Sequence, residues 1–146
     1  MSDLSGKKIL LLVNNQGVEQ DELKVPADKL RADGAEVTVA APESGEVKSL
    51  VGDWDLGETF PVDATISSVD DAAYDLLLLP GGTLSADSLR LDEDAQKIAK
   101  AFASSGRPVA SICHGPWLLV ESGLVDGKTL TSYQSVKTDI VNAGGS

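Results

Sequence analysis

The sequence predicts an α/β domain built on a mainly parallel sheet with helices on both faces. Short apolar segments of strand length alternate along the chain with segments of helical periodicity, which is the pattern of strand–helix–strand units. Hydrophobic residues make up 42% of the chain and aromatic residues only 4%, so the core must be aliphatic, as in a buried parallel sheet. A length of 146 residues fits one domain, residues 1–146.

The first third of the chain predicts one strand–helix–strand unit. Residues 7–13, two lysines followed by a continuous apolar run at 9–13, indicate a buried strand, followed by a polar loop at 14–17. Acidic residues then open a helix over 19–32, where they complement the helix dipole. Pro26 suits a first turn or else kinks this helix. Residues 35–40 alternate in polarity and indicate the second strand.

The middle of the chain is less regular. Residues 42–62 are rich in Gly, Asp and Glu, and we expect an irregular or hairpin-like excursion with β-type pieces at 47–51 and 59–62. Residues 64–72 are polar and indicate a short helix or a turn. The leucine run at 75–79 is the next buried strand.

The last third predicts two further strands, each followed by a helix. An amphipathic helix spans 92–105 and is followed by an apolar strand at 108–112. A helix over 117–122 follows this strand directly. A short strand at 129–132 and a last helix at 134–142 complete the chain.

The only cysteine and the only histidine, Cys113 and His114, stand side by side between a strand and a helix. With Ser111 and Gly115 as small flanking residues, the pattern is that of a nucleophile elbow, a sharp turn that lifts a reactive side chain out of the sheet. Backbone N–H groups and the helix dipole at such a turn favour a thiolate. The alternative is structural, because a lone cysteine is often a small buried hydrophobe and a lone histidine a packing residue.

A second feature is the Pro80-Gly81-Gly82 segment at the end of the strand at 75–79. Ligands of doubly wound sheets bind outside the carboxyl ends of the strands, and glycines let backbone N–H groups approach a substrate oxygen. The alternative is a plain turn.

Composition excludes several classes of function. A net charge of −11 without a basic patch argues against nucleic acid or an anionic membrane as a partner. One cysteine forms no intramolecular disulfide, and no apolar run approaches the ~18 residues of a membrane span, so we expect a cytoplasmic protein. We expect no metal, because no further Cys or His completes a zinc site, and no dinucleotide, because the loop at 14–17 lacks the GxGxxG pattern.

Three motifs in order resemble the PfpI-type intracellular protease branch of the DJ-1/PfpI superfamily. They are Glu19-Gln20-Asp21-Glu22-Leu23, Leu79-Pro80-Gly81-Gly82 and Ala110-Ser111-Ile112-Cys113-His114-Gly115-Pro116. The likeness covers essentially the whole chain. It implies the class I glutamine amidotransferase-like, flavodoxin-like fold, a three-layer sandwich.

The resemblance also implies roles for individual residues. Cys113 is the nucleophile, His114 the general base and Glu22 a glutamate that hydrogen-bonds near the sulfur. The N–H groups of Gly82 and His114 form the oxyanion hole. Supporting positions fall to Glu19, Gly81, Gly115, Tyr133 at the pocket rim, and Asp87, which matches an acid that orients the histidine of a neighbouring subunit.

The function expected from these residues is that of a cysteine-dependent, stress-related hydrolase acting on a small carbonyl, acyl or peptide-like substrate. Peptidase or amidase, glyoxalase and deglycase chemistry all fit, and the resemblance implies a homo-oligomer. The alternatives are a redox sensor or holdase chaperone that uses oxidation of Cys113, or an inactive scaffold. The inactive scaffold is an alternative because members of the family usually continue past residues 142–144 with two strands and a helix. We therefore expect a C-terminally shortened domain.

Overall fold

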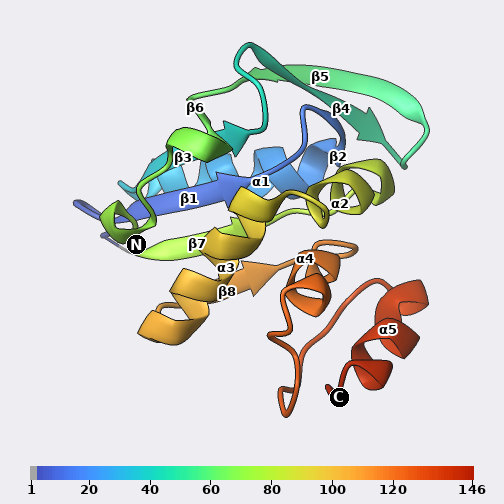
Figure 1. Ribbon diagram of the computed structural model, residues 1–146. Helices are drawn as coiled ribbons and strands as arrows, with labels where there is room; N and C mark the ends of the chain where they lie inside the picture. Colours follow the sequence, from blue (N-terminus) through green and yellow to red (C-terminus); the bar gives the residue numbers. More distant parts are fainter. Residues whose placement is uncertain (1–2) are drawn as a thin grey trace.

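A five-stranded parallel sheet forms the centre of the molecule (Figure 1). The computed structural model describes residues 3–146. The strands are β1 (Lys8–Leu12), β3 (Glu36–Ala41), β6 (Ala64–Thr65), β7 (Leu76–Leu79) and β8 (Val109–Ser111). Their order across the sheet is β6-β3-β1-β7-β8, so β1 is the middle strand and β8 lies at an edge.

The continuous apolar run of β1 arises because both faces of the sheet are covered. Ile9 and Leu11 point into a core shared with Leu23 of helix α1 (Gln20–Ala32). Leu10 lies in a second core that contains Phe102 of helix α3 (Glu93–Ser105). Side chains alternate along a strand, so helices on both faces require apolar residues at consecutive positions. The predicted three-layer α/β architecture is confirmed.

Helix α1 contains a proline well inside its length. Leu23 and Ala27 are the buried residues that attach the helix to the sheet. Pro26 has no N–H group and leaves the carbonyl of Glu22 without its usual helical hydrogen bond. Of the two placements left open for Pro26, the structure therefore has the interior one.

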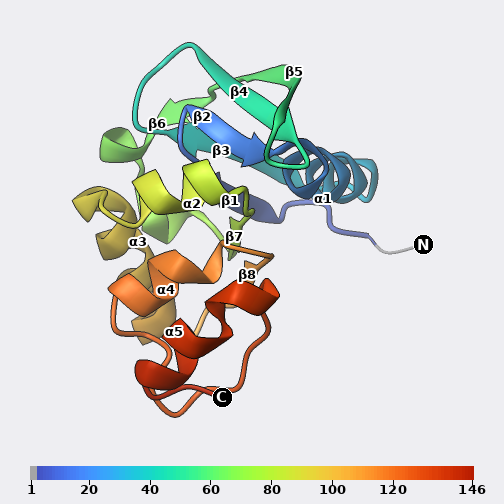
Figure 2. The same cartoon turned by 90° about the vertical axis from the view of Figure 1, so that its right-hand side faces the viewer.

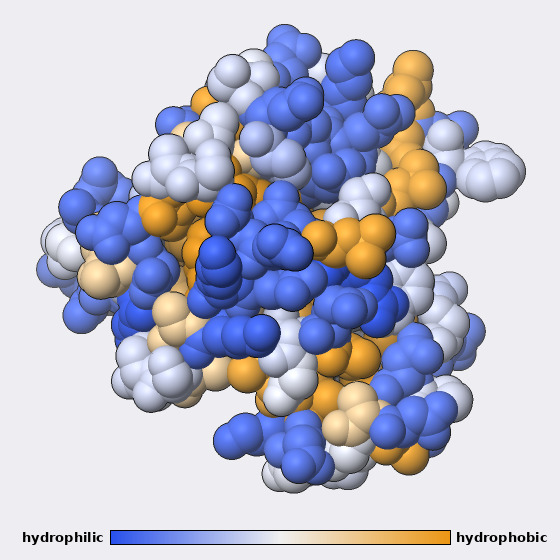
Figure 3. Space-filling view, viewed as in Figure 1, coloured by the Kyte–Doolittle hydropathy of each residue, from blue (hydrophilic) through white to orange (hydrophobic). Residues whose placement is uncertain are grey.

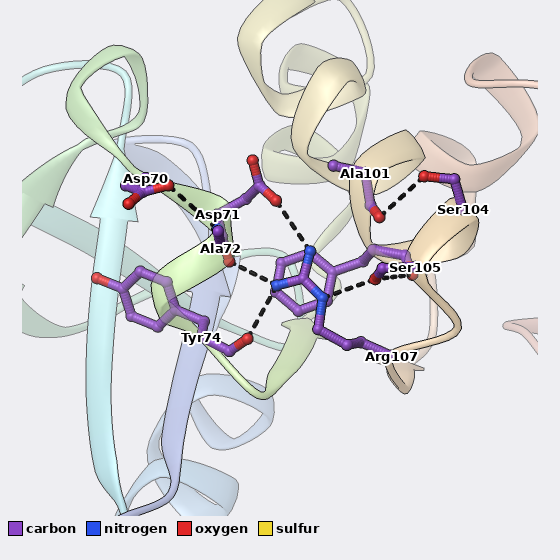
Figure 4. Close-up of polar contacts among 9 residues, drawn as sticks. Asp70, Asp71, Ala72, Tyr74, Ala101, Ser104, Ser105 and Arg107 are labelled. Atoms are coloured by element: carbon purple, nitrogen blue, oxygen red, sulfur yellow. Dashed lines mark hydrogen bonds and ion pairs between the residues drawn. The ribbon is translucent and has the colours of Figure 1, made fainter.

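Helix α3 begins and ends as its sequence predicts. The Asp92 side chain accepts a hydrogen bond from the Ala95 N–H at 2.9 Å, and Gly106 ends the helix in the left-handed conformation. Directly after it, the Arg107 guanidinium donates to the carbonyl oxygens of Asp71 and Tyr74 and pairs with the Asp71 carboxylate at 2.9 Å (Figure 4). These contacts join the start of β8 to the 3₁₀ turn η2 (Asp71–Ala73).

A second, smaller sheet lies beside the first. Its strands are β2 (Gln16–Glu19), β4 (Glu46–Val51) and β5 (Asp55–Pro61), in the order β2-β4-β5. The pair β4–β5 is antiparallel, which confirms the hairpin expected within 42–62. The loop predicted at 14–17 is only half right, because residues 16 and 17 begin β2, which pairs with β4 and buries Val18.

The remaining elements are short. They are η1 (Ile66–Ser68), α2 (Thr83–Leu89), α4 (Pro116–Glu121), η3 (Gln134–Val136) and α5 (Lys137–Asn142). Helix α2 was not predicted. The strand expected at 129–132 is wrong: this segment is irregular, and its Leu130 N–H instead bonds to the Ser146 carbonyl. In Figure 2, α4 and α5 lie together near the C-terminus, on the side of the sheet opposite the β4–β5 hairpin.

The face drawn in Figure 3 is mostly polar, and its apolar side chains include groups at the β4–β5 hairpin and around α4 and α5. Trp54 and Leu56 of the hairpin are almost fully exposed. Within residues 3–146, none of the helices is both long enough and apolar enough to span a bilayer.

Candidate active site

Cys113 follows β8 on a turn that requires an unusual backbone conformation. Its φ of 59° is one of two positive φ angles at non-glycine residues within 3–146, the other belonging to Asp53. A left-handed residue at this point reverses the chain between strand and helix, as a nucleophile elbow does. The two flanking residues must be small, because a Cβ on Gly115 would meet the Leu79 carbonyl oxygen and stand 2.7 Å from the Ser111 hydroxyl oxygen.

His114 is buried, with 5% of its surface exposed, and its ring is held on two sides. Tyr133 stacks on it at a centroid distance of 4.8 Å, and the Trp117 ring meets it edge-on at 5.0 Å. The Nδ1 atom lies 3.2 Å from the Cys113 sulfur. The elbow therefore brings a possible nucleophile and a possible base into hydrogen-bond contact.

Glu22 reaches the same place from α1. Its Oε1 accepts a hydrogen bond from the Gly81 N–H at 2.8 Å. A Cβ on Gly81 would meet this carboxylate oxygen and stand 2.8 Å from the Cβ of Cys113. Gly81 is thus the residue whose lack of a side chain lets the glutamate and the cysteine approach each other.

The pKa values of Cys113 and Glu22 are both raised. Burial, and next the charge of Glu22, raise the pKa of the Cys113 thiol to about 11. Burial is also the main cause that raises the pKa of the Glu22 carboxyl. The backbone N–H groups at the turn favour a thiolate, as expected, but burial and the neighbouring carboxylate outweigh them.

Those backbone donors are nevertheless present. The N–H groups of His114 and Gly82 both hydrogen-bond toward the Cys113 sulfur and lower the pKa of the thiol, although by less than the opposing causes raise it. They are the two groups expected to form an oxyanion hole. Since they point to the sulfur, an oxygen bound to the same carbon as the sulfur would lie within their reach.

Glu19 supports the site without facing the sulfur. As the residue before α1, it accepts hydrogen bonds from the N–H groups of Gly52 (2.7 Å) and Asp53 (2.9 Å). Asp53 in turn accepts from the N–H and the hydroxyl of Thr83, at 2.8 and 2.7 Å. The sequence analysis did not single out Asp53 or Thr83, and their spacing of thirty residues carries no signal that they meet.

Asp87 stands apart from these groups. It is exposed on α2, and within the described residues no hydrogen bond links it to His114. The role that the resemblance gives it, toward a neighbouring subunit, stays a prediction.

The site opens into a cavity of about 500 Å³. Its lining consists of Glu19, Glu22, Gly52, Asp53, Cys113, Ser132 and Tyr133. A search of residues 3–146 finds no group of three or more His, Cys, Asp or Glu side chains that could hold a metal ion. The residues around the cavity offer a thiol, an imidazole, carboxyl groups and backbone N–H donors.

Comparison with known proteins agrees with these features. The model of the DJ-1/PfpI family matches residues 7–146. A deglycase of Pyrococcus horikoshii is 39% identical over 137 residues, which are 94% of this chain and 78% of the relative. A Bacillus subtilis protein named as a candidate cysteine protease is 40% identical over 138 residues, with the same two coverages.

The fold agrees as well. The crystal structure of Drosophila melanogaster DJ-1beta superposes with a TM-score of 0.82 and 31% identity, covering 97% of this chain and 72% of that one. The residues that the family model matches include Glu22, the glycines at 81–82 and the Cys113 turn. The protein belongs to the DJ-1/PfpI family.

Proposed function

We propose that this protein is a cysteine-dependent enzyme that attacks a small carbonyl compound with Cys113, in deglycase- or glyoxalase-type chemistry. The observation that carries the proposal is the 3.2 Å contact between the Cys113 sulfur and His114 Nδ1 at a cavity wall. The names of the similar proteins, deglycase and candidate cysteine protease, support an enzyme of this class.

The first chemical step follows from the positions of these groups. The thiol proton passes to His114 Nδ1 as the sulfur bonds to the carbonyl carbon, and the π electrons of the C=O bond move to its oxygen. The N–H groups of Gly82 and His114 hold that oxygen, and the proton returns to it from the imidazole to give a thiohemiacetal. A base beside the sulfur is needed because a thiol with a pKa of about 11 carries little thiolate at neutral pH.

The charges of the cavity disfavour an anionic substrate. Three of its lining residues, Glu19, Glu22 and Asp53, carry carboxyl groups, and the lining has no Lys or Arg. An anionic substrate would be repelled there. A neutral 2-oxoaldehyde, or the neutral adduct that such an aldehyde forms with an amine or a thiol, avoids this repulsion.

The alternative function, a peroxide sensor that works by oxidation of Cys113, is less well supported. Oxidation by peroxide proceeds through the thiolate. The raised pKa of Cys113 makes it a slow sensor, whereas a base that removes the proton during attack serves an enzyme.

Methylglyoxal tests the proposal, with D-lactate as the product measured. Addition of water to methylglyoxal gives lactate with no other reactant. We expect turnover by the wild-type chain, none by Cys113→Ala, and a loss of about a hundredfold in His114→Gln, the scale of a lost general base. Val141→Ala, an exposed change on α5, serves as a control that keeps wild-type turnover.

Measurable turnover that is equal in the wild type and Cys113→Ala would contradict the proposal. Absence of turnover in both would reject 2-oxoaldehydes as substrates, and glycated peptides and amide substrates would be assayed next.

Assembly into a homo-oligomer and a cytoplasmic location are further parts of the proposal. Size-exclusion chromatography with light scattering tests the assembly.

A further inference from the structure

A chain of hydrogen-bonding groups leads away from the far side of the His114 ring. While Nδ1 faces the Cys113 sulfur, Nε2 lies 3.4 Å from the hydroxyl oxygen of Thr83. That hydroxyl lies 2.7 Å from Oδ2 of Asp53, and Oδ1 of Asp53 accepts from the Thr83 N–H at 2.8 Å. Asp53, Thr83, His114 and Cys113 thus form one line of contacts.

The proton positions along this line follow from the chemistry of each group. An ionised carboxylate only accepts hydrogen bonds, so the single Thr83 proton points to Asp53. The Thr83 oxygen then offers only its lone pairs to the imidazole, and Nε2 must carry a proton to use them. In the neutral ring, Nδ1 is consequently the unprotonated nitrogen, and it faces the thiol.

We propose that Asp53, acting through Thr83, is a positioning residue that holds His114 as the Nε2–H tautomer with Nδ1 free to receive the Cys113 proton. The inference rests on the proposed function only for the purpose of the proton transfer from Cys113 to Nδ1; the tautomer itself does not depend on it. It names an acid on the same chain as the histidine that it orients, in contrast to the role toward a neighbouring subunit expected of Asp87.

The backbone around Asp53 shows how the carboxylate is kept in place. Asp53 follows the end of β4 with a φ of 62°, a left-handed conformation that Asp and Asn tolerate better than most residues. The two hydrogen bonds from Gly52 and Asp53 to Glu19 fasten this turn to the start of α1. Glu19 therefore contributes to the site by fixing the turn that carries Asp53.

Nitrogen-15 NMR of the imidazole measures the tautomer directly, and His114 is the only histidine of the chain, so its two ring signals need no assignment among several residues. Spectra would be recorded at about pH 8, where an ordinary imidazole is neutral. The variants are Asp53→Asn, Thr83→Val and Thr83→Ser, with Asp55→Asn as the control. Asp55 lies two residues away and is exposed, so its change removes the same charge without touching the line of contacts.

We expect the Nε2–H tautomer in the wild type, in Thr83→Ser and in Asp55→Asn. In Asp53→Asn the new amide N–H donates to the Thr83 oxygen and frees the hydroxyl proton for Nε2, so the signals shift toward the Nδ1–H form. Thr83→Val removes the acceptor and gives a mixture of tautomers. Iodoacetamide should alkylate Cys113 at least about tenfold more slowly in Asp53→Asn, because a ring protonated on Nδ1 cannot accept the thiol proton. In Thr83→Val the loss should be about twofold, because part of the ring population keeps Nδ1 free.

A wild-type protein in the Nδ1–H form overturns the proposal, as does a Thr83→Val variant that matches Thr83→Ser in both tautomer and alkylation rate. Circular dichroism of each variant verifies that the fold is retained. The tautomer is measured without substrate, so failure to convert methylglyoxal would reject 2-oxoaldehydes as substrates and leave this inference standing. The Nδ1–H tautomer in the wild type would overturn this inference and leave the proposed function to be decided by the turnover assay.

Discussion

The Arg107 cluster and the Cys113 site are both partly buried polar networks, but they differ in how well their polar groups are paired. Arg107 is 22% exposed in its side chain, donates to Asp71, Tyr74 and Ser105, and lies 3.9 Å over the Phe102 ring. Each polar group there has a partner of opposite character, and the Arg107 contacts visible in Figure 4 bring separate segments together. Such a network contributes stability.

At the Cys113 site the groups are kept in less favourable states. Cys113 has a left-handed backbone, and two acidic groups with raised pKa values, Cys113 and Glu22, lie side by side. The hydroxyl of Ser111, two residues before Cys113, is buried with no hydrogen-bond partner in the structure. Features of this kind cost stability and are retained where chemistry needs them. The Arg107 cluster therefore stabilises the fold, whereas the Cys113 site lowers stability and depends on the rest of the fold to keep its geometry.

The largest effect should come from filling the space between Glu22 and Cys113. Gly81→Ala places a methyl group against the Glu22 carboxylate, the Cys113 Cβ and the His114 nitrogen. We expect a loss of about 3 kcal/mol in the free energy of unfolding, the upper range for overpacking, and loss of methylglyoxal turnover. Urea unfolding and the lactate assay measure the two effects, and unchanged values in both would show that this space is not tightly packed.

Arg107→Ala should destabilise the protein without changing the site. Removing the guanidinium leaves the Asp71 carboxylate and two carbonyls without their charged donor, so we expect a loss of about 2 kcal/mol in unfolding free energy. The rate of Cys113 alkylation should stay at the wild-type value under folding conditions. Arg107→Lys, which keeps the charge and loses the planar fork, should recover part of the stability; a change in alkylation rate would break the separation of the two regions.

Glu22→Gln should stabilise the protein in a pH-dependent way. The pKa of Glu22 is raised in the folded state, mainly by burial, so the folded state binds its proton more tightly and wild-type stability falls as pH rises above the carboxyl's ordinary value of 4.5. Glutamine still offers an oxygen to the Gly81 N–H but carries no charge. We expect Glu22→Gln to be more stable than the wild type at neutral pH and to lose this advantage at acidic pH.

The same variant should lower the pKa of the Cys113 thiol, because the Glu22 charge is one of the causes that raise it. Alkylation rate against pH measures this shift. A thiol titration that is identical in Glu22→Gln and the wild type would contradict the coupling between the two groups.

The last effect is expected only in alkali. The pKa of Cys113 is raised from 9.0 to about 11, so the folded state resists deprotonation and wild-type stability should fall as pH rises through this interval. Cys113→Ala removes the titrating group. The difference in melting temperature between the two proteins should change between about pH 9 and pH 11 and be constant below it, and a constant difference throughout would contradict the raised value.

The sequence predicted the elements that are defined by their own pattern. The leucine runs of β1 and β7 and the capped, amphipathic α3 carry strong local signals, and the structure confirms them. The elements it missed depend on partners. Strand β2 includes Gly17 and exists because it pairs with β4, and α2 is only seven residues long, too short for a clear helical period.

The candidate site divides in the same way. Cys113 and His114 are adjacent in sequence and their motif is local, so they could be named in advance. Glu22 came from resemblance alone. Asp53 and Thr83 lie thirty residues apart and meet only because the second sheet packs against α2, an arrangement that no local pattern encodes.

The second sheet carries part of the cavity wall but neither Cys113 nor His114. The thiol and the imidazole are mounted on the large parallel sheet, whereas Gly52 and Asp53 of the cavity wall belong to the β4–β5 hairpin, which hydrogen-bonds as a separate sheet. A change in the sequence or length of this hairpin alters the shape and charge of the cavity without shifting the register of β8, the strand that leads to Cys113. The hairpin is thus an exchangeable part, and grafting hairpins from related proteins onto this scaffold is a route to altered substrate preference with the reacting pair left intact.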